Sequence, residues 1–318
     1  MAPVRKLAVA AVALAAIGAA GFWFLTMPNR LGADELAQLG SGDAKRGERI
    51  FNAGGCTSCH ARPKSEGAAR LELAGGVELK TPFGTFVAPN ISSDPNDGIG
   101  KWTAEDLADA MLRGVSPEGE HLYPAFPYAS YARMKPSDIG DLYAYLKTLP
   151  AVAGKAPDHR LGFPFNIRRG LGLWKLFYLS KQPVVALAAD APEPAKLGQY
   201  LVEGPGHCGE CHTPRDFAGG VKKGEWLAGA VAAEGEGVVP NITGGEGGLG
   251  AWSADEIAYF LETGFTPDFD SVGGSMVEVQ KNMAQLSPED RQAIAAYLKA
   301  VPPHANGYPA KAAKPTAS

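Results

Sequence analysis

The stretches "GGCTSCHARP", residues 54–63, and "GHCGECHTPR", residues 206–215, follow one pattern. Each has two cysteines three positions apart and a histidine directly after the second cysteine. We call these stretches the first and the second cysteine box. Together they use all 4 cysteines of the 318-residue chain. The fold and the chemistry of the chain therefore depend on what the two boxes hold.

The cysteine boxes belong to a longer internal repeat, whose matching segments lie 150 to 152 residues apart. These segments are "WTAEDLADAMLRGVSP" from 102 and "WSADEIAYFLETGFTP" from 252, "APNIS" at 88–92 and "VPNIT" at 239–243, and "DLYAYLKTLP" at 141–150 and "AIAAYLKAVP" at 293–302. One module of about 100 residues therefore occurs twice, which predicts two similar folds side by side rather than a solenoid.

Apolar residues within each module recur at helical spacing. The matching faces are formed by Ile139, Leu142, Tyr143 and Leu146 and by Ile294, Tyr297, Leu298 and Val301. Ser253 with Glu256 is a capping box, which marks a helix start. The segments between are rich in glycine and proline, and no run alternates clearly enough to indicate a strand. We therefore predict an all-α fold of short helices and long loops, which need a large apolar group to pack against.

The N-terminal segment predicts export. Arg5 and Lys6 precede 20 apolar or small residues, Leu7 to Thr26. About 20 such residues span a bilayer, whereas the apolar core of a signal peptide usually has about 7–15. We expect an uncleaved transmembrane anchor over residues 1–30, with the rest of the chain on the periplasmic side of a bacterial inner membrane. A soluble periplasmic protein, released by cleavage, is the alternative.

Three interpretations of the cysteine boxes compete: two disulfides, a zinc site of four cysteines, and covalent haem. Disulfides and zinc give His60 and His212 no role and leave the loops without a filler. Covalent haem uses every element of each box, and c-type haem is attached outside the cytoplasm. We therefore predict two haem c groups. The cysteines bond the vinyl groups and the following histidine ligates iron: Cys56, Cys59 and His60 in the first box, and Cys208, Cys211 and His212 in the second.

The chain resembles membrane-anchored dihaem c-type cytochromes built from two class I cytochrome c domains. It is similar to the cytochrome subunits that accept electrons from periplasmic alcohol, aldehyde or gluconate dehydrogenases. The resemblance rests on the boxes, the "PNI" loops and the "AYLK" helices, and it covers residues 41 to 303. It implies domains at 41–151 and 193–303, joined by a linker at 152–192 and followed by a disordered tail at 304–318. It also implies that Asn90 and Asn241 run beside the haem edges, although both could be simple turn formers.

The resemblance assigns the sixth iron ligand to a methionine before the last helix of each domain. In the second module this residue is Met276, with Met283 as a lesser candidate. In the first module the corresponding position holds Phe126, which cannot bind iron. We predict Met134 as the substitute, with His121 as the alternative ligand. An iron with an open sixth position is a further possibility, and Met111 is the weakest candidate.

The net charge of −4 and the pI of about 5.9 give no broad basic surface, which argues against a nucleic-acid partner. The sequence shows no catalytic triad, nucleotide-binding loop or carboxylate dyad. We therefore expect an electron carrier that passes electrons from a dehydrogenase toward quinone or a terminal oxidase. The alternative is a dihaem redox enzyme, a peroxidase or a thiosulfate-type dehydrogenase, that uses the haem of the first module as an open catalytic site.

Overall fold

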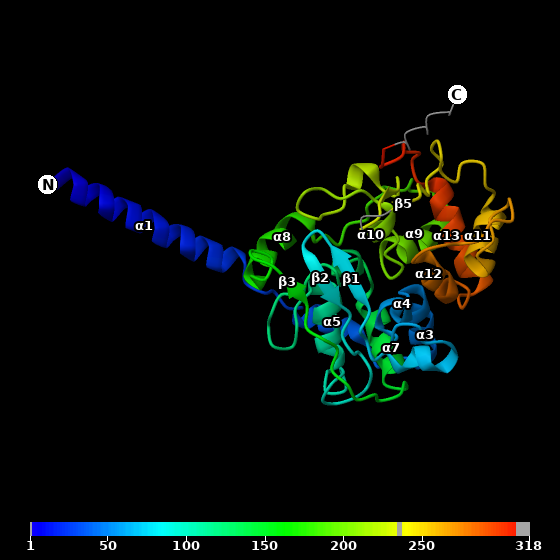
Figure 1. Cartoon of the computed structure of the whole chain (residues 1–318), viewed down its shortest axis with the longest axis horizontal. Helices are drawn as coiled ribbons and strands as arrows, with labels where there is room; N and C mark the ends of the chain where they lie inside the picture. Colours follow the sequence, from blue (N-terminus) through cyan, green and yellow to red (C-terminus); the bar gives the residue numbers. More distant parts are fainter. Residues whose placement is uncertain (1, 234–236, 310–318) are drawn as a thin grey trace, which may run out of the picture.

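A computed structural model of the chain describes residues 2–233 and 237–309. Helix α1 (Ala2–Leu25) extends away from the globular part of the molecule (Figure 1). Its span Pro3–Leu25 is long and apolar enough to cross a membrane and is not buried against the rest of the chain. After α1, the short helix α2 (Ala33–Leu36) and the 3₁₀ helix η1 (Ala37–Leu39) lead into the first module.

The first module surrounds one hydrophobic core, in which Phe51, Leu73 and Ile139 are buried. Its helices and strands are α3 (Ala44–Ala53), α4 (Cys56–His60), η2 (Gly67–Glu72), β1 (Glu78–Thr81), β2 (Gly84–Val87), α5 (Ala104–Arg113), α6 (Tyr128–Tyr131) and α7 (Pro136–Leu146). The segment that follows contains β3 (Arg160–Leu161), η3 (Arg168–Gly170) and α8 (Leu171–Tyr178).

The second module surrounds a second core, in which Leu201, Ile257 and Tyr297 are buried. Its elements are α9 (Glu193–Glu203), α10 (Gly209–His212), η4 (Lys223–Glu225), β4 (Ala230–Val231), β5 (Val238–Val239), α11 (Ala254–Thr263), α12 (Met276–Met283) and α13 (Pro288–Ala300). The order of the helices repeats that of the first module, so α9, α10 and α13 occupy the places of α3, α4 and α7.

Within each module the first and last helices cross at a glycine. A Cβ atom on Gly47 of α3 would lie 2.0 Å from the carbonyl oxygen of Asp141 in α7. A Cβ atom on Gly198 of α9 would lie 1.8 Å from the carbonyl oxygen of Ala293 in α13. Since real Cβ contacts are never this short, only glycine allows these helix backbones to approach so closely. The crossing holds the helix that leads into each cysteine box against the last helix of the same module.

The structure corrects the prediction of an all-α fold, because the described residues are largely helical but also form two small antiparallel sheets. One has the strand order β1-β2-β3 and the other pairs β4 with β5. The hairpin turns between Thr81 and Gly84, and Gly84 has a φ of +124° that favours glycine. Strands of two to four residues are too short to show a clear alternation of apolar and polar side chains, so the sequence pattern could not reveal them.

One predicted helix start is confirmed. Ser253 accepts a hydrogen bond from the backbone of Glu256, and the reciprocal bond completes the capping box of α11. The predicted disordered tail needs a correction at its start, because the Gly307 nitrogen donates to the Ala228 carbonyl at 2.8 Å. The carbonyl of His304 also accepts a hydrogen bond from the second module. The remainder of that predicted tail, 310–318, lies outside the described residues.

Candidate haem sites

The first cysteine box forms helix α4. Cys56, Cys59 and His60 stand at positions i, i+3 and i+4, so their side chains share one face of the helix. Gly55 precedes the helix with a left-handed φ of +56°, which turns the chain sharply into it. Nδ1–H of His60 donates to the carbonyl oxygen of Pro89 at 2.8 Å. This bond fixes the ring and leaves Nε2 as the nitrogen that can bind a metal.

The second cysteine box repeats this arrangement. Cys208 precedes α10 with helical backbone angles, and Cys211 and His212 follow at the same spacing as in the first box. His212 is buried, and its Nδ1–H donates to the carbonyl oxygen of Pro240 at 2.8 Å. In both modules the acceptor is therefore the proline of the "PNI" motif. Each histidine has one nitrogen engaged by the protein and one available for iron.

Titration behaviour distinguishes these boxes from redox-active dithiols. Burial raises the pKa of the Cys56 thiol and of the Cys208 thiol to about 12. Redox-active Cys-x-x-Cys pairs instead stabilise a thiolate and have lowered pKa values. Burial also lowers the pKa of His60 and of His212, although the hydrogen bond to the proline carbonyl opposes this shift. The histidines are therefore neutral imidazoles near pH 7, which is the form that ligates iron.

Asn90 and Asn241 hold the loops that position these histidines. The Asn90 side chain donates to the carbonyl oxygens of Val152 and Gly154 at 2.7 and 3.0 Å. The Asn241 side chain donates to the carbonyl oxygen of His304 at 2.9 Å. Both asparagines are buried and also accept a bond from the backbone two residues later, which closes the turn. The structure thus gives them a turn-forming role, and their contact with a haem edge stays a prediction.

The donor set of each box fits covalent haem c. Two thiols and one imidazole nitrogen on one helical turn are what two thioether bonds and one axial iron ligand require. A zinc ion would need four ligands that converge on one point. Among residues 2–233 and 237–309, no group of three or more His, Cys, Asp or Glu side chains could hold a metal ion by itself. The two boxes therefore do not join into the zinc site that their cysteines alone would have allowed.

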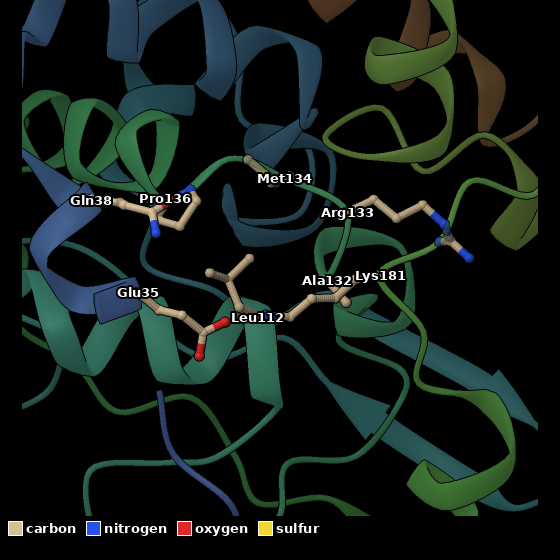
Figure 2. A pocket seen from close by; sticks show the side chains of 8 residues that line it. All are labelled: Glu35, Gln38, Leu112, Ala132, Arg133, Met134, Pro136 and Lys181. Atoms are coloured by element: carbon tan, nitrogen blue, oxygen red, sulfur yellow. Dashed lines mark hydrogen bonds and ion pairs between the residues drawn. The ribbon is translucent and has the colours of Figure 1, made fainter. Parts of the chain in front are cut away.

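The candidates for the sixth ligand of the first module have different environments. Met134 is buried in the first core, against which the partly buried Phe126 and Cys56 pack. It also borders a cavity of about 250 Å³ that lies between α2, α5 and the start of α7 (Figure 2). His121 is buried with both ring nitrogens engaged. Its Nε2–H donates to the Thr26 carbonyl at 2.9 Å, and its Nδ1 accepts from Lys175 at 3.0 Å. Ligation by His121 would require both bonds to break.

The candidates of the second module lie at the two ends of α12. Met276 is its first residue and packs against the second core while partly exposed. Met283 is its last residue and is fully buried in that core. Met276 therefore stands at a helix start directly after Ser275 and the glycine pair 273–274, whereas Met283 is packed inside the core, and ligation of iron by Met276 stays a prediction.

The sequence did not predict the contacts between the two modules. These contacts occur in equivalent pairs, one in each direction across the interface. Ser58, between the cysteines of the first box, accepts a hydrogen bond from Asn282 of α12 at 3.0 Å. Glu210, between the cysteines of the second box, accepts one from Ser130 of α6 at 2.8 Å. Adding 152 to 58 and 130 gives 210 and 282, so the two contacts are equivalents. Each box therefore touches the short helix that precedes the last helix of the other module.

The boxes also meet each other directly. Nε2–H of His207, which precedes Cys208, donates to the carbonyl oxygen of Gly54 at 3.2 Å. The His207 ring packs edge-on against Tyr131 of the first module, with 5.6 Å between the ring centroids. Only the folded arrangement could show this, because the residues lie about 150 positions apart and no local pattern pairs them. The two attachment turns are therefore neighbours across the interface.

Comparisons with known proteins agree with this architecture. Residues 44–150 match the cytochrome c family. The chain is 53% identical over 299 residues to a Cereibacter sphaeroides protein described as "Diheme cytochrome c-type", covering 94% of this chain and 99% of that protein.

Two further relatives are cytochrome c subunits of dehydrogenases. The chain is 38% identical to that of the alcohol dehydrogenase (quinone) of Gluconobacter oxydans, covering 81% of this chain and 54% of that subunit. It is 35% identical to the gluconate 2-dehydrogenase cytochrome c subunit of Pantoea cypripedii, covering 81% of this chain and 59% of that subunit. The chain thus spans a little over half the length of these two subunits.

These findings confirm the cofactor and the class of function. The family match and the full-length relative show two covalently bound haem c groups. When bound, each haem supplies a one-electron iron couple, and the relatives that carry it are electron-transfer proteins. With sequence, fold and box geometry in agreement, the chain belongs to the family of dihaem c-type cytochromes.

Proposed function

We propose that this chain is a membrane-anchored periplasmic electron carrier with one haem in each of two tandem domains, 41–151 and 193–303. Cys56 and Cys59 attach the first haem and His60 ligates its iron. The equivalent residues of the second box, Cys208, Cys211 and His212, hold the second haem. The observation that supports this assignment best is the matched pair of bonds from His60 to Pro89 and from His212 to Pro240, each of which leaves Nε2 available for iron.

The same proposal names the sixth ligands. Met276 serves the second haem, because it opens α12 from a glycine-rich loop beside the second core. Met134 serves the first haem, because its side chain already shares a core with Cys56, whereas both His121 nitrogens are engaged elsewhere. Methionine opposite histidine gives a six-coordinate iron with a raised potential, which suits electron transfer without bond making.

Electrons would pass between the modules at the interface where the boxes meet. The Gly54–His207 hydrogen bond joins the two attachment turns, and the Tyr131 ring packs on His207 beside it. Protein atoms therefore connect the two sites without an intervening solvent gap at this point. The residues there hold the two attachment turns at a fixed separation while electrons cross.

The partners follow from the relatives. Cytochrome subunits of alcohol, gluconate and fructose dehydrogenases align with most of this chain. We assign a periplasmic dehydrogenase as the electron donor and a quinone or terminal oxidase as the acceptor, with α1 as the anchor. Membranes from cells that lack this chain should lose oxygen uptake with the substrate of one such dehydrogenase and keep it with NADH. Unchanged uptake with alcohols, gluconate and fructose would contradict a partner of this class.

The axial ligands are tested with three methionine variants of the full chain: Met134→Leu, Met276→Leu and, as a control from the same core as Met134, Met111→Leu. Leucine conserves volume, so each variant should fold with both haems attached. We expect the red absorption band of iron–thioether bonding to fall by half in each of the first two variants and to stay unchanged in the control.

The same samples separate the carrier from a redox enzyme. A carrier with both irons six-coordinate should bind no carbon monoxide when reduced, and each of the first two variants should gain one binding site. Carbon monoxide binding or peroxide turnover by the unmodified protein would show an open iron and contradict the proposal. A thioether band that survives in Met134→Leu at full strength would remove Met134 as a ligand.

A further inference from the structure

Helix α8 exposes large apolar side chains on one face and buries its single charged residue, Lys175. Leu173, Leu176 and Phe177 stand at helical spacing on one face and are 37%, 58% and 79% exposed. The opposite face carries Gly172 and Lys175, and both are buried. A helix on a soluble surface normally buries its apolar face and exposes its charges. We call Leu173, Leu176 and Phe177 the outer face of α8.

The inward position of Lys175 is built into the first module. Its Nζ donates to the carbonyl oxygens of Arg113 and Gly114 at 2.7 and 2.6 Å, at the C-terminal end of α5. It also lies 4.9 Å from the centre of the Tyr128 ring. A cation is favoured at a helix C-terminus, where unpaired carbonyls converge. These contacts hold α8 in an orientation that leaves its outer face uncovered by the described residues.

Helix α8 is also fastened to the end of α1. A Cβ atom on Gly172 would lie 2.6 Å from the Cα atom of Thr26, and Thr26 is fully buried. The Arg169 guanidinium lies 4.2 Å from the centre of the Trp23 ring and donates to the Trp23 carbonyl and the Thr26 hydroxyl. Figure 1 shows α8 beside the point where α1 leaves the globular part. Helix α8 is therefore held at the C-terminal end of α1.

The length of α1 places this junction at a membrane boundary. Leu7 to Thr26 are 20 residues, which at about 1.5 Å per residue span about 30 Å, the thickness of the hydrocarbon core. If Leu7 lies at one boundary, Thr26 lies at the other. Trp23 near that end suits the interfacial position that tryptophan prefers. Since Gly172 touches Thr26, α8 then lies at the bilayer surface.

We propose that the outer face of α8 rests on the lipid bilayer that α1 crosses, with its apolar side chains inserted at the level of the headgroups. This inference rests on the proposed anchoring by α1. The exposed apolar character continues into the preceding segment, where Phe163 is 81% exposed and Ile167 is 50% exposed. A lipid surface accounts for both the exposed apolar face of α8 and its attachment to α1. The contact would hold the first module at a fixed orientation over the membrane.

The experiment uses the full chain with both haems in vesicles of phosphatidylethanolamine and phosphatidylglycerol. The photoreactive residue p-benzoylphenylalanine replaces Phe177, Phe269 or Leu14 in separate variants. Phe269, 87% exposed in the second module, is the matched solvent control, and Leu14 of α1 reports anchoring. None of the three side chains is buried, so haem content should stay unchanged. After illumination, mass spectrometry of the peptides detects lipid adducts.

We expect lipid adducts at positions 177 and 14 and none above background at 269. Adducts at 14 without adducts at 177 would overturn the surface contact and leave the anchor intact. Crosslinks from 177 to a protein subunit in native membranes, in place of lipid, would assign the face to a partner protein and equally overturn the proposal. A mature protein that lacks α1 would overturn the anchor and this inference together, while its two haem spectra would leave the carrier function standing.

Discussion

At the scale of single residues, polar side chains buried between the modules matter as much as the cysteines. Asn282 in α12 is 2% exposed, accepts a hydrogen bond from Thr57 at 2.8 Å and donates to Ser58 at 3.0 Å. Both partners lie between Cys56 and Cys59. One amide of the second module therefore holds the turn that contains the first pair of cysteines.

We predict that Asn282→Ala lowers the free energy of unfolding by about 1–3 kcal/mol, because it leaves the buried Thr57 hydroxyl without this partner. Denaturant unfolding followed at the haem bands measures the change. Asn96→Ala, at an exposed loop position, is the control and should stay within about 0.5 kcal/mol. Equal effects of the two substitutions would show that the Asn282 contact does not stabilise the interface.

Glu35 links α2 to two cations, Arg113 of α5 and Lys181 after α8. The hydrogen bond from Lys181 contributes most to lowering the pKa of Glu35 from 4.5 to about 2. A carboxyl group with a lowered pKa stabilises the folded state above its unfolded pKa and loses this effect as pH falls through its folded pKa. The contribution of Glu35 should therefore be complete at pH 7 and disappear between about pH 4.5 and pH 2.

Glu35→Gln should accordingly lower the free energy of unfolding at pH 7 by about 1–2 kcal/mol and converge with the unmodified protein as the pH approaches 2. Guanidinium unfolding at several pH values measures both the loss of stability at pH 7 and the convergence near pH 2. Glu118→Gln, which removes an exposed carboxylate, serves as the control. A constant difference between variant and unmodified protein at all pH values would contradict this role of Glu35.

At the scale of elements, the crossing of the first and last helix organises each module. Gly47 and Gly198 occupy equivalent places, 151 residues apart, and each allows one helix backbone to touch another. These crossings place the cysteine boxes, because the first box starts directly after α3 and the second starts three residues after the end of α9. The periodic helix faces made α7 and α13 predictable, and the capping box made the start of α11 predictable, because both signals are local.

Gly198→Ala should lower the free energy of unfolding by about 1–3 kcal/mol, since the new methyl group meets the Ala293 carbonyl and the helices must separate. Thermal unfolding with circular dichroism measures the effect. The matched control is Gly224→Ala, where a Cβ atom meets nothing within 4 Å. A melting temperature of Gly198→Ala equal to that of the control would mean that α9 and α13 cross with more room than the structure shows.

The elements that the sequence did not reveal lack a local signal. Strand β3 has two residues, and it joins β2 only because residues about 75 positions apart come together. The presence of two haem c groups and the turns of the "PNI" loops were predictable because each is marked by a short motif. The contacts of Asn282 with Thr57 and of His207 with Gly54 were not predictable. Each joins residues of two different modules, and such a pair produces no local pattern in the sequence.

At the scale of the whole molecule, the two modules pack as a pseudo-symmetric pair. Arg49 of α3 makes a bidentate ion pair with Asp290 at the start of α13, with distances of 2.7 and 2.6 Å. In the equivalent place, Tyr200 of α9 bonds to Asp138 at the start of α7. Such an isologous contact joins the same two surfaces twice. Each module therefore contacts the other through both its first and its last helix.

This mutual support predicts the behaviour of a chain with one haem. A Cys208→Ala, Cys211→Ala double variant should carry one haem per chain by intact mass, and its second module should lose helix. The remaining haem site should unfold at a lower denaturant concentration, with a loss of at least about 1 kcal/mol, because its interface hydrogen bonds are weakened. The mirror variant, Cys56→Ala with Cys59→Ala, is the control. An unchanged midpoint for the remaining site would show that the modules fold independently.

The equivalence of the Ser58–Asn282 and Ser130–Glu210 contacts means that the halves meet as two copies of one protein would. Separate one-haem proteins with this contact would part on dilution, and their electron exchange would then depend on collision. Here the linker joins the two modules covalently. The effective concentration of one module near the other therefore stays high however dilute the protein is. The rate of electron transfer between the two haems should therefore not depend on the concentration of the protein.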